Sequence, residues 1–463
     1  MLLIVKPYTC VKTDLERTID TMVARYLSTS AVRPLRRAQF DVKAIVSQVS
    51  QHAEAIHARQ LVSGGQLIAQ LNALPLQNQE AKHLDTQIAG VQTRRKAIER
   101  QIKQDKTHMH QLKGELVDLK NAFKRLNLDL TSVRDSIHET CLSLPNLVGK
   151  DVPLTAPQEV CSINPMPKYV ADPQRDHHDI MVRKNLVDFK SAATVSGNSW
   201  YYLVNDGALL EQALVSYATK RARQHGFSMC HPPSIAKNEV IDACGFRPRD
   251  MNNEQQIYHL AEGELGLTAT AEISLAGMQI DSVLELPRGV KKLCGVSRSY
   301  RAEAGARGKD TRGLYRVHEF TKVELFCWAH PDESGQVLQD LLELQMKLVS
   351  ELGLSAKVLN MPANDLGAPA FRKYDIEAWM PGRGAFGEIT SASNCTDFQS
   401  RRMGTRFRDP ATGKTAFVHT LNGTAMAVPR IMVAIVENFY DPATGMVKIP
   451  EPLVPYMDDK THI

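Results

Sequence analysis

The 463-residue sequence lacks the short motifs that mark several common kinds of binding site. Its eight cysteines include no C-x-x-C pair, which argues against a zinc ribbon or a disulfide framework and favours reduced, mostly buried thiols. No zinc is therefore expected. No G-x-G-x-x-G or Walker loop follows an expected strand, so neither a Rossmann nor a P-loop nucleotide site is indicated. No apolar run approaches the roughly 18 residues of a membrane-spanning helix, so no membrane partner is expected.

The composition is that of an ordinary soluble globular chain. Hydrophobic residues make up 43% and charged residues 23% of the sequence, and the length suffices for two or three domains. The net charge of +5 permits a nucleic-acid partner without establishing one. The cluster Asp176-His177-His178-Asp179 suggests a metal site, but no further Cys or His lies at ligand spacing. We therefore interpret this cluster as a solvated turn.

The first 38 residues differ in composition from the rest of the chain. They hold only three acids, Asp14, Glu16 and Asp20, and apolar, Ser and Thr residues fill the gaps between the bases. This pattern is typical of a mitochondrial transit peptide, and Arg25-Tyr26-Leu27-Ser28 resembles a matrix-processing site. Residues 1–38 are therefore predicted to direct the protein to the mitochondrial matrix; the alternative is a disordered tail. The basic residues are Lys6, Lys12, Arg17, Arg25, Arg33, Arg36 and Arg37.

Residues 39–145 carry a heptad pattern and little proline. In their second half, apolar residues alternate spacings of three and four over four heptads, namely Met109, Leu112, Leu116, Leu119, Phe123, Leu126, Leu130, Val133 and Ile137. The same spacing appears upstream at Leu84, Ile88, Val91, Ile98 and Ile102, with Arg95 at one position of the seam. The break between Ile102 and Met109 predicts two antiparallel helices joined by a tight turn. A helix of roughly 35 residues extends about 50 Å, so this arm is expected to project into solvent.

The predicted arm is basic, with twelve Lys or Arg against seven Asp or Glu between positions 82 and 137. Charges that flank a heptad seam are commonly just the solvated faces of the helices. Alternatively, a protruding cationic coiled coil can follow an RNA backbone through phosphate contacts. The pattern alone leaves both interpretations open.

The rest of the chain reads as an α+β domain. Pro145-Asn146 ends the second helix, and residues 146–178 suit a linker. Beyond it, residues 291–296, 322–328, 374–379 and 416–419 read as strands, and residues 337–352 and 428–438 read as helices. Mixed elements without regular βαβ alternation predict a mostly antiparallel sheet in residues 179–463.

Residues 298–326 are the most informative stretch of the sequence. They read as a strand, a charged Gly-rich loop and a return strand that carries Glu324. Arg301 and Glu303 are expected on one strand face, because side chains two residues apart point the same way. The loop carries Arg307, Lys309 and Arg312, and arginine is the usual bidentate partner of a polyphosphate. This arrangement suits a nucleotide; the alternative is a salt-bridged hairpin on the surface.

The order of residues in this stretch distinguishes the two. R-x-E, then D-T-R-G-L-x-R, then H-x-F-x-K-V-E resembles motif 2 of the class II aminoacyl-tRNA synthetases, and the seryl branch in particular. The resemblance extends over nearly the whole chain from about residue 40. Residues 207–214, followed by His231-Pro232-Pro233, resemble motif 1, which forms the dimer interface of the class. Residues 419–430 resemble motif 3, and Thr424, Ala425 and Pro429 look like the mitochondrial form.

The resemblance implies a fold and partners. The fold is a class II synthetase-like antiparallel sheet flanked by helices in residues 179–463, preceded by a linker, 146–178, and a helical coiled-coil arm, 39–145. The arm is expected to grip the long variable arm of tRNA(Ser). A homodimer is expected, with L-serine, ATP and tRNA(Ser) as substrates and Mg²⁺ as the cofactor.

The resemblance also implies a role for each matching residue. The residues expected to bind serine are Thr270, Ala271, Glu272, Arg301, Glu324, Asn422 and Thr424. Those expected to bind ATP are Arg301, Ala302, Glu303, Arg312, Val317, Phe320, Glu388, Ile389, Thr390, Ser391 and Arg430. The hard oxygen ligands expected for Mg²⁺ are Glu388 and Ser391. The residues expected to be catalytic are Arg301, Glu303, Arg312 and Arg430.

Individual roles follow from charge and shape. Arg301 is expected to hold the α-phosphate and the serine carboxylate, and Arg312 the γ-phosphate, while Phe320 stacks on the adenine. Glu303 is expected to face the adenine amino group and Glu324 the serine hydroxyl. The carboxylate of the Thr-x-Glu segment is the natural partner of the serine ammonium. Two departures from the usual family pattern are Ala269, where Gly is common, and Glu319, where Gln is common.

The expected activity is therefore ATP-dependent seryl-tRNA synthesis, through seryl-adenylate. One rival is an inactive synthetase-like protein that binds RNA or protein; it predicts losses among the charged residues above, and none is lost. A second rival loads an activated amino acid onto a carrier protein; it predicts a missing or shortened arm, whereas this seam runs four heptads.

Overall fold

The structure is a computed structural model that describes residues 35–104, 109–246, 256–261, 263–286, 289–302, 312–410 and 412–463. Residues 37–463 form one compact unit. Glu303, Arg307, Lys309 and most of the predicted transit peptide lie outside the described residues. Within the described ranges, no helix has both the length and the apolar character needed to cross a membrane.

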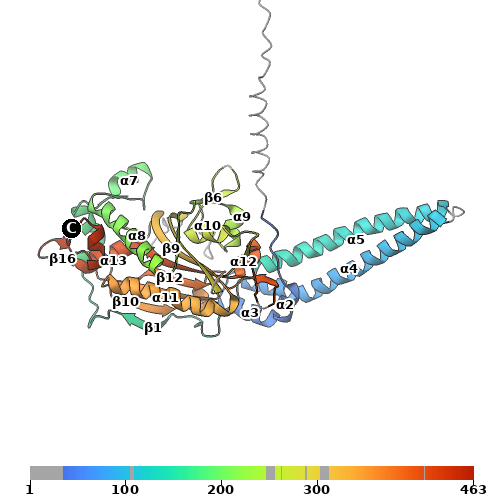
Figure 1. Ribbon diagram of the computed structural model, residues 1–463, viewed down its shortest axis with the longest axis horizontal. Coiled ribbons are helices and arrows are strands. Elements are labelled where there is room, and N and C mark those ends of the chain that lie inside the picture. The colour runs from blue at the N-terminus through green and yellow to red at the C-terminus, as the bar shows by residue number, and fades with distance from the viewer. Residues whose placement is uncertain are drawn as a thin grey trace, which may run out of the picture. The chain divides into compact units, whose positions relative to one another are not determined.

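Figure 1 labels the main elements of this unit. The helices are α2 (Val42–Ser47), α3 (Val49–Ala58), α4 (Gly64–Gln104), α5 (Met109–Ser143), α6 (His177–Arg183), α7 (Phe189–Val195), α8 (Asp206–Gln224), α9 (Asn238–Ala243), α10 (Ala271–Gly277), α11 (Ser334–Glu351), α12 (Phe398–Met403) and α13 (Val428–Phe439). The strands are β1 (Gln158–Ile163), β2 (Val187–Asp188), β3 (Tyr202–Leu203), β4 (Ser228–Cys230), β5 (Ile235–Lys237), β6 (Leu265–Leu267), β7 (Val283–Leu284), β8 (Val290–Tyr300), β9 (Glu319–Ala329), β10 (Ala356–Asn360), β11 (Arg372–Met380), β12 (Ala385–Asn394), β13 (Arg406–Arg408), β14 (Thr415–Phe417), β15 (His419–Ala427), β16 (Tyr440–Asp441) and β17 (Met446–Val447).

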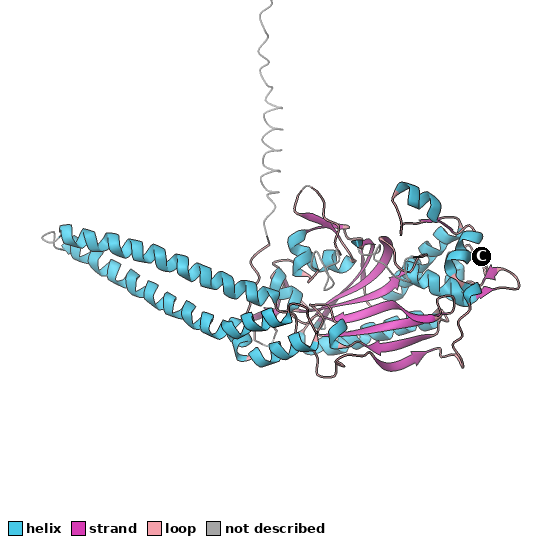
Figure 2. Ribbon diagram, turned by 180° about the vertical axis from the view of Figure 1, so that it is seen from behind, coloured by secondary structure: helices cyan, strands magenta, loops and turns pink. Residues whose placement is uncertain are grey.

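The heptad pattern forms the expected helical hairpin. Helices α4 and α5 run side by side in both views, and their facing apolar residues make one cluster (Figures 1 and 2). Helix α5 has the expected length, 35 residues, while α4 is longer, with 41. Arg95, at the polar position of the seam, is exposed and pairs with Glu99 one turn further along α4, with 3.0 Å between Nε and Oε1. The predicted N-terminal coiled-coil arm is therefore confirmed.

A buried arginine lies just before the α4–α5 hairpin. Arg59, which follows α3, is 1% exposed. Its guanidinium donates hydrogen bonds to the main-chain carbonyls of Leu366, Gly367, Asn146 and Ala370, at 2.7–3.1 Å. Burial lowers the pKa of Arg59 to about 10, although the nearby Cys395 acts in the opposite direction, so the side chain remains a cation at neutral pH. The base of the α4–α5 hairpin is therefore fixed to residues 366–370 and to Asn146 through main-chain acceptors.

Residues 158–427 contain one large sheet, whose strands Figure 2 shows side by side. The strand order is β1-β10-β11-β12-β15-β9-β8-β4, and every pairing is antiparallel except β4 with β8. The predicted strands at 291–296, 322–328 and 374–379 fall within β8, β9 and β11. The mostly antiparallel α+β class is therefore confirmed.

Two segments differ from the sequence-based expectation. The stretch 416–419, expected as one strand, is divided at Val418: β14 pairs with β13 in a small sheet, whereas β15 belongs to the large one. Residues 146–178, expected as a linker, also supply β1 and the start of α6. Strand β1 lies at the edge of the sheet, and most of its residues are exposed, so it lacks the apolar alternation that signals a strand.

Helices α8, α11 and α13 pack with the large sheet in one apolar core. Helix α11 places Val337, Leu341, Leu344 and Leu348 in that core at spacings of three and four, as an amphipathic helix does. Helix α8 contains the motif 1-like segment 207–214. Its Gly207 permits a close approach, since a Cβ there would lie 2.1 Å from the carbonyl oxygen of Leu186.

Candidate functional site

A cavity of about 260 Å³ lies beside β9, β12 and β15, at the start of α13. It brings together most residues that the sequence predicts for the nucleotide, namely Arg301, Val317, Phe320, Glu388, Ile389, Thr390, Ser391 and Arg430, and also Thr424, which the sequence predicts for serine. Its other lining residues are Leu314, Tyr315, Arg316, Lys322, Ala427 and Pro429. These side chains come from segments that are far apart in the sequence, so the tertiary fold creates the site.

One wall of the cavity combines a cation with an aromatic ring. The sequence suggested that Arg301 lies within a strand. Strand β8 ends at Tyr300, however, so Arg301 lies one residue beyond it. The guanidinium of Arg301 lies 5.2 Å from the ring centroid of Phe320 on β9. A flat base can stack on such a ring while the cation beside it faces an anion.

Arg430 and Tyr315 also line this cavity. Arg430 follows Pro429 in the first turn of α13, a position that proline favours in a helix. Its guanidinium lies 4.8 Å from the ring centroid of Tyr315, and that of Arg383 lies 4.1 Å from the same ring. The tyrosine thus holds two cations near each other, and one of them, Arg430, lines the cavity.

Glu388 and Arg430 lie side by side at the wall of the cavity. The Nη1 atom of Arg430 lies 3.1 Å from Oε2 of Glu388 and also donates to its main-chain oxygen at 3.1 Å. Desolvation raises the pKa of Glu388, but the charges of Arg430, Lys373 and Arg301 outweigh it and hold the pKa at about 2. The carboxylate is therefore ionised throughout the physiological range, and its side chain is 37% exposed toward the cavity.

Behind this carboxylate, strand β11 carries a buried ion pair. Lys373 Nζ lies 2.8 Å from Oδ2 of Asp375, which is directly opposite Ser391 on β12. Burial raises the pKa of Asp375 to about 7; the charge of Glu388 adds to this rise, while Lys373 opposes it. The pair places a positive charge near Glu388, on the same face of the sheet.

A second, smaller polar group lies next to the cavity around Glu324. This side chain is 1% exposed and forms an ion pair with Lys322, two residues earlier on β9. Thr270 donates to Oε2 of Glu324 at 3.1 Å and accepts from Nζ of Lys322 at 3.2 Å. Burial raises the pKa of Glu324, whereas Lys322, Thr270 and Arg301 lower it.

Glu272 completes this polar group. Thr270 is the N-cap of α10 and accepts from the main-chain N of Glu272 at 3.3 Å, which turns the carboxylate inward. The Oε1 atom of Glu272 accepts from Asn422 Nδ2 at 2.9 Å and from Gln399 Nε2 at 2.7 Å. Burial and the neighbouring Glu324 raise the pKa of Glu272 to about 7, although Gln399 and Lys322 oppose the rise. Two buried carboxylates beside a single lysine make this pocket suitable for one more cation.

Arg312 does not join the cavity. Its guanidinium instead bonds to Asp179 and lies 3.2 Å from Nδ1 of His178, and it is 59% exposed. The cluster at residues 176–179, expected to be a solvated turn, is exposed only in part. His177 is buried between Glu437, at 2.7 Å from Nδ1, and the main-chain N of Leu314, which donates to Nε2 at 3.2 Å.

Three predicted residues remain to be placed: Ala271, Ala302 and Glu303. Ala271 is fully buried as the first residue of α10. Ala302 follows Arg301, and its N–H donates to the carbonyl of Gln256 at 3.1 Å. Glu303 lies outside the described residues.

Sequence reasoning did not single out Lys322, Gln399 or Tyr315. For Lys322 a signal exists, because it alternates with Phe320 and Glu324 on one strand face. For Gln399 and Tyr315 there is none, since their partners come from distant segments of the chain.

Comparisons with known proteins show which proteins this chain resembles. Residues 258–439 match the family model described as "tRNA synthetase class II core domain (G, H, P, S and T)". A protein of Saccharomyces cerevisiae named "Serine--tRNA ligase, mitochondrial" is 56% identical over 431 residues, 93% of this chain and 97% of its own. A protein of the same name from Schizosaccharomyces pombe is 38% identical over 427 residues, 88% of this chain and 87% of its own.

A solved structure is also similar. The crystal structure of seryl-tRNA synthetase from Pyrococcus horikoshii complexed with ATP superimposes with a TM-score of 0.82. It is 30% identical in sequence, and the match covers 92% of this chain and 99% of that one.

Proposed function

This chain belongs to the serine–tRNA ligases, the seryl branch of the class II synthetases, and from that premise we propose how its residues divide the work. It activates L-serine with ATP to give seryl-adenylate and pyrophosphate, and it transfers serine to tRNA(Ser) in mitochondrial translation. One observation carries the assignment of roles: the cavity with Arg301, Phe320 and Arg430 adjoins the polar group around Lys322 and Glu324.

The activation step requires two anions to approach each other. The carboxylate of serine attacks the α-phosphorus of ATP, and pyrophosphate leaves. We assign Arg301 to both anions, because its guanidinium lies 5.2 Å from the centroid of the Phe320 ring and its charge also lowers the pKa of Glu324. We assign Arg430 to the phosphates, since its cation is held at the cavity wall. Fixed charges of this kind stabilise developing charge without reorganising during the reaction.

The serine side chain and ammonium fit the two buried carboxylates. We assign Glu272 to the ammonium, since its Oε1 is already fixed by Asn422 and Gln399. We assign Glu324 to the hydroxyl, since an alanine in the pocket would leave this buried carboxylate without that donor. A site built to bond a hydroxyl rejects the analogue without it strongly, whereas exclusion of threonine rests on crowding around one methyl, worth about 1–3 kcal/mol.

A magnesium ion fits beside Glu388 and Ser391. The carboxylate of Glu388 is ionised, with a pKa of about 2, and faces the cavity that Ser391 also lines. Hard oxygen ligands of this kind suit Mg²⁺. When bound, the ion supplies neutralising charge to the phosphate oxygens. Glu303 and Arg312 remain proposed nucleotide ligands from the family motif.

An inactive synthetase-like protein that only binds RNA or protein is the alternative. It predicts that charged residues of the cavity have been replaced. Arg301, Glu388 and Arg430 are all present and share one cavity, which favours activity.

Serine-dependent exchange of pyrophosphate into ATP tests the proposal directly. We expect exchange by the wild type and none by Arg301→Ala, which should still bind tRNA. Binding of ATP without any exchange by the wild type would support the inactive alternative. Collapse of tRNA binding in Arg301→Ala would instead overturn the division between cavity and arm.

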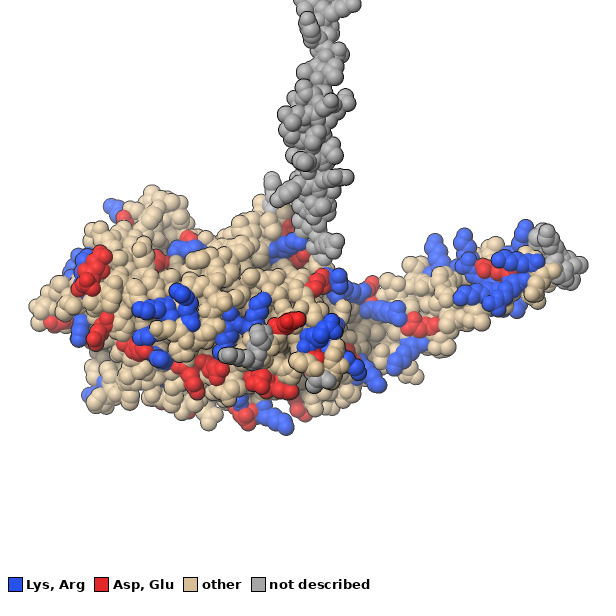
Figure 3. Space-filling view, viewed as in Figure 1, with Lys and Arg blue, Asp and Glu red and all other residues tan. Residues whose placement is uncertain are grey.

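We propose that the arm binds tRNA(Ser). Lys and Arg side chains gather on it toward the turn between α4 and α5 (Figure 3). The exposed basic residues there are Arg94, Arg95, Lys96, Arg100, Lys103, Lys113, Lys120, Lys124 and Arg125. Such charges suit phosphate contacts, whose strength depends on salt.

Neutralising part of this surface tests the role of the arm. In a variant with Lys96, Arg100, Lys113 and Lys120 changed to Gln, we expect serine activation to persist while charging of tRNA falls and its salt dependence weakens. Lys414→Gln, also on an exposed residue, is the matched control. Unchanged charging would remove the arm from tRNA recognition. Deletion of residues 84–137 should have the same effect in a stronger form.

We further propose a homodimer in the mitochondrial matrix. Helix α8 carries the motif 1-like segment, and β4, which follows it, is an edge strand with Met229 42% exposed. Such an edge is usually covered in the native assembly. A monomeric mass in solution would contradict the dimer. Failure of the full chain to enter isolated mitochondria, or its arrest outside the matrix, would contradict the proposed location.

A further inference from the structure

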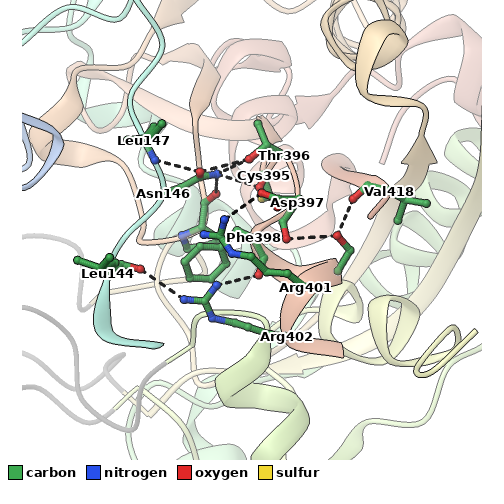
Figure 4. A network of polar contacts seen from close by, with 12 residues as sticks. Leu144, Asn146, Leu147, Cys395, Thr396, Asp397, Phe398, Arg401, Arg402 and Val418 are labelled. Carbon is green, nitrogen blue, oxygen red and sulfur yellow. Dashed lines mark hydrogen bonds and ion pairs between the residues drawn. The ribbon is translucent and has the colours of Figure 1, made fainter. Parts of the chain in front are cut away.

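Helix α12 lies between the base of the arm and the pocket that contains Glu272. Figure 4 shows its Arg402 directed at the carbonyl of Leu144, just beyond the end of α5. Arg402 Nη2 donates to Leu142 at 3.0 Å and to Leu144 at 3.4 Å, and its guanidinium lies 3.5 Å from the ring centroid of Phe398. Ser400 donates to the carbonyl of Val418 at 2.6 Å. The helix is therefore fixed in place through residues other than Gln399.

Gln399 projects from this fixed helix into the pocket. It is fully buried, and its Nε2 donates to Oε1 of Glu272 at 2.7 Å and to the carbonyl of Cys244 at 3.4 Å. Both partners are acceptors, so the hydrogen-bond network assigns the amide nitrogen, and not the oxygen, to this side. Asn422 donates to the same carboxylate oxygen. Two amide donors thus converge on one atom of Glu272.

These donors act on both the orientation and the charge of Glu272. A buried carboxylate rotates to follow its donors, and hydrogen bonds to the ionised form favour ionisation. Gln399 is the closer of the two donors, at 2.7 Å against 2.9 Å for Asn422. Each amide has a second acceptor, the sulfur of Cys395 for Asn422 at 3.5 Å and the carbonyl of Cys244 for Gln399 at 3.4 Å. The shorter of the two hydrogen bonds to the carboxylate therefore comes from α12.

We propose that Gln399 is a positioning residue for serine activation, holding the carboxylate of Glu272 ionised and aimed at the serine ammonium. The inference rests on the proposed role of Glu272. Gln399 does not itself touch the substrate. It is expected to act on serine binding alone, because the cavity assigned to ATP, with Phe320 and Arg430, is not lined by Gln399 or Glu272.

The test compares two variants by serine-dependent pyrophosphate exchange between pH 6 and 9. Gln399→Met keeps the length and removes the donor. We expect the KM for serine to rise about ten- to hundredfold, as for a lost hydrogen bond to a charged group, with the KM for ATP nearly unchanged. The acidic limb of kcat/KM for serine should move to higher pH, because Glu272 loses a donor that favours its ionised form.

Gln399→Glu gives a second, opposite signature. Its carboxyl can donate to Glu272 only while protonated, so activity with serine should fall as the pH rises through neutrality. This variant has nearly the shape of glutamine, and it keeps the proposal falsifiable if the Met variant does not fold. An unchanged serine KM in Gln399→Met, or equal rises in both KM values, would overturn the proposal.

Arg402→Met is the matched control for disturbance of α12. It removes the contacts with Leu142 and Leu144 but leaves Gln399 in place. We expect lower stability to heat without a shift of the pH profile. If Arg402→Met moved the acidic limb as far as Gln399→Met, the effect would belong to packing of α12 and the proposal would be wrong. Absence of exchange in the wild type would reject the proposed function itself, a different and separable outcome.

Discussion

Arg430 and Glu388 neutralise each other at the wall of the cavity, where one nitrogen of the guanidinium lies 3.1 Å from both the carboxylate and the main-chain oxygen of Glu388. This pairing fixes two charges of opposite sign at the proposed site for the phosphates of ATP and their metal. It also keeps Glu388 ionised at any pH at which the enzyme works. The charges of this pair therefore stay the same across the physiological pH range.

Glu388→Gln should weaken the use of magnesium at all pH values. We expect exchange to fall by at least about hundredfold at moderate Mg²⁺, with partial recovery at high Mg²⁺, because one of the two proposed hard oxygen ligands loses its charge. The measurement is the Mg²⁺ dependence of exchange at pH 6, 7 and 8. Glu343→Gln is the control: Glu343 is exposed on α11, outside the cavity lining, and its replacement should leave the Mg²⁺ dependence intact. Equal effects of the two substitutions would contradict the metal assignment.

Serine use should depend on pH through Glu272, whose pKa burial and Glu324 raise to about 7. We expect kcat/KM for serine to fall about tenfold per unit below pH 7, because the ammonium needs the ionised carboxylate. Glu272→Gln should lose this limb. A flat profile down to pH 5.5 would show that another group binds the ammonium.

The same shift predicts the pH dependence of stability. The folded-state pKa of about 7 exceeds the ordinary value of 4.5, so protonation of Glu272 favours the folded state. This contribution is complete below about pH 4.5 and is lost as the pH rises through 7. Comparing urea unfolding of the wild type and Glu272→Gln between pH 5 and 8 should therefore show that the variant gains relative stability as the pH rises.

Lys322→Met should destabilise the protein and weaken serine binding together. The lysine is buried with Glu324, and removal of one member of a buried ion pair commonly costs about 3–5 kcal/mol because the other charge remains unpaired. Without the lysine, the pKa of Glu324 should rise further. The double variant Lys322→Met, Glu324→Gln should recover much of the stability in urea unfolding, but not serine activation. No recovery would mean that Lys322 acts through packing rather than charge.

Glu324→Ala should reduce the preference for serine over alanine. Under the proposed assignment, alanine leaves the buried carboxylate of Glu324 without the hydroxyl donor, which penalises alanine heavily. We expect the ratio of kcat/KM for the two amino acids to fall at least about hundredfold, mainly by loss of serine activity. Exchange assays with each amino acid give the ratio. A preserved ratio would assign recognition of the hydroxyl to a different side chain.

Arg59→Met should loosen the base of the arm. Four buried carbonyl contacts are lost at once, and unsatisfied buried polar groups cost about 1–3 kcal/mol each, although such costs are not additive. A fall of at least about 3 kcal/mol in unfolding free energy is expected. Arg134→Met removes an exposed pair with Asp85 on the arm and should cost no more than about 1 kcal/mol. Similar losses in the two variants would contradict a structural role for Arg59.

The sequence was most informative where structure or chemistry is local. The arm follows from a repeat of seven that any α-helix converts into a stripe. The strand predicted at 291–296 and the helix predicted at 337–352 follow from apolar spacing alone. Most of the nucleotide cavity followed from motif order, because family motifs retain the residues that meet in space.

What the sequence did not reveal depends on approach between distant segments. Gln399 bonds to a residue 127 positions earlier, and Arg312 to one 133 positions earlier. No spacing rule links such pairs. Strand β1 was not predicted because most of its side chains are exposed at the sheet edge. A strand with both faces largely exposed does not need alternating apolar residues.

The acceptors of Arg59 are all main-chain oxygens. The two sides of this contact therefore differ in how freely their residues can be replaced. The residues at 366, 367 and 370 can be replaced without removing a single acceptor, provided that the backbone path is kept. The arginine has no such latitude, since no other side chain offers five donors in a planar fork. A graft of this arm onto a related catalytic body therefore requires a matching loop trace, and Arg59, but no matching residues in the loop.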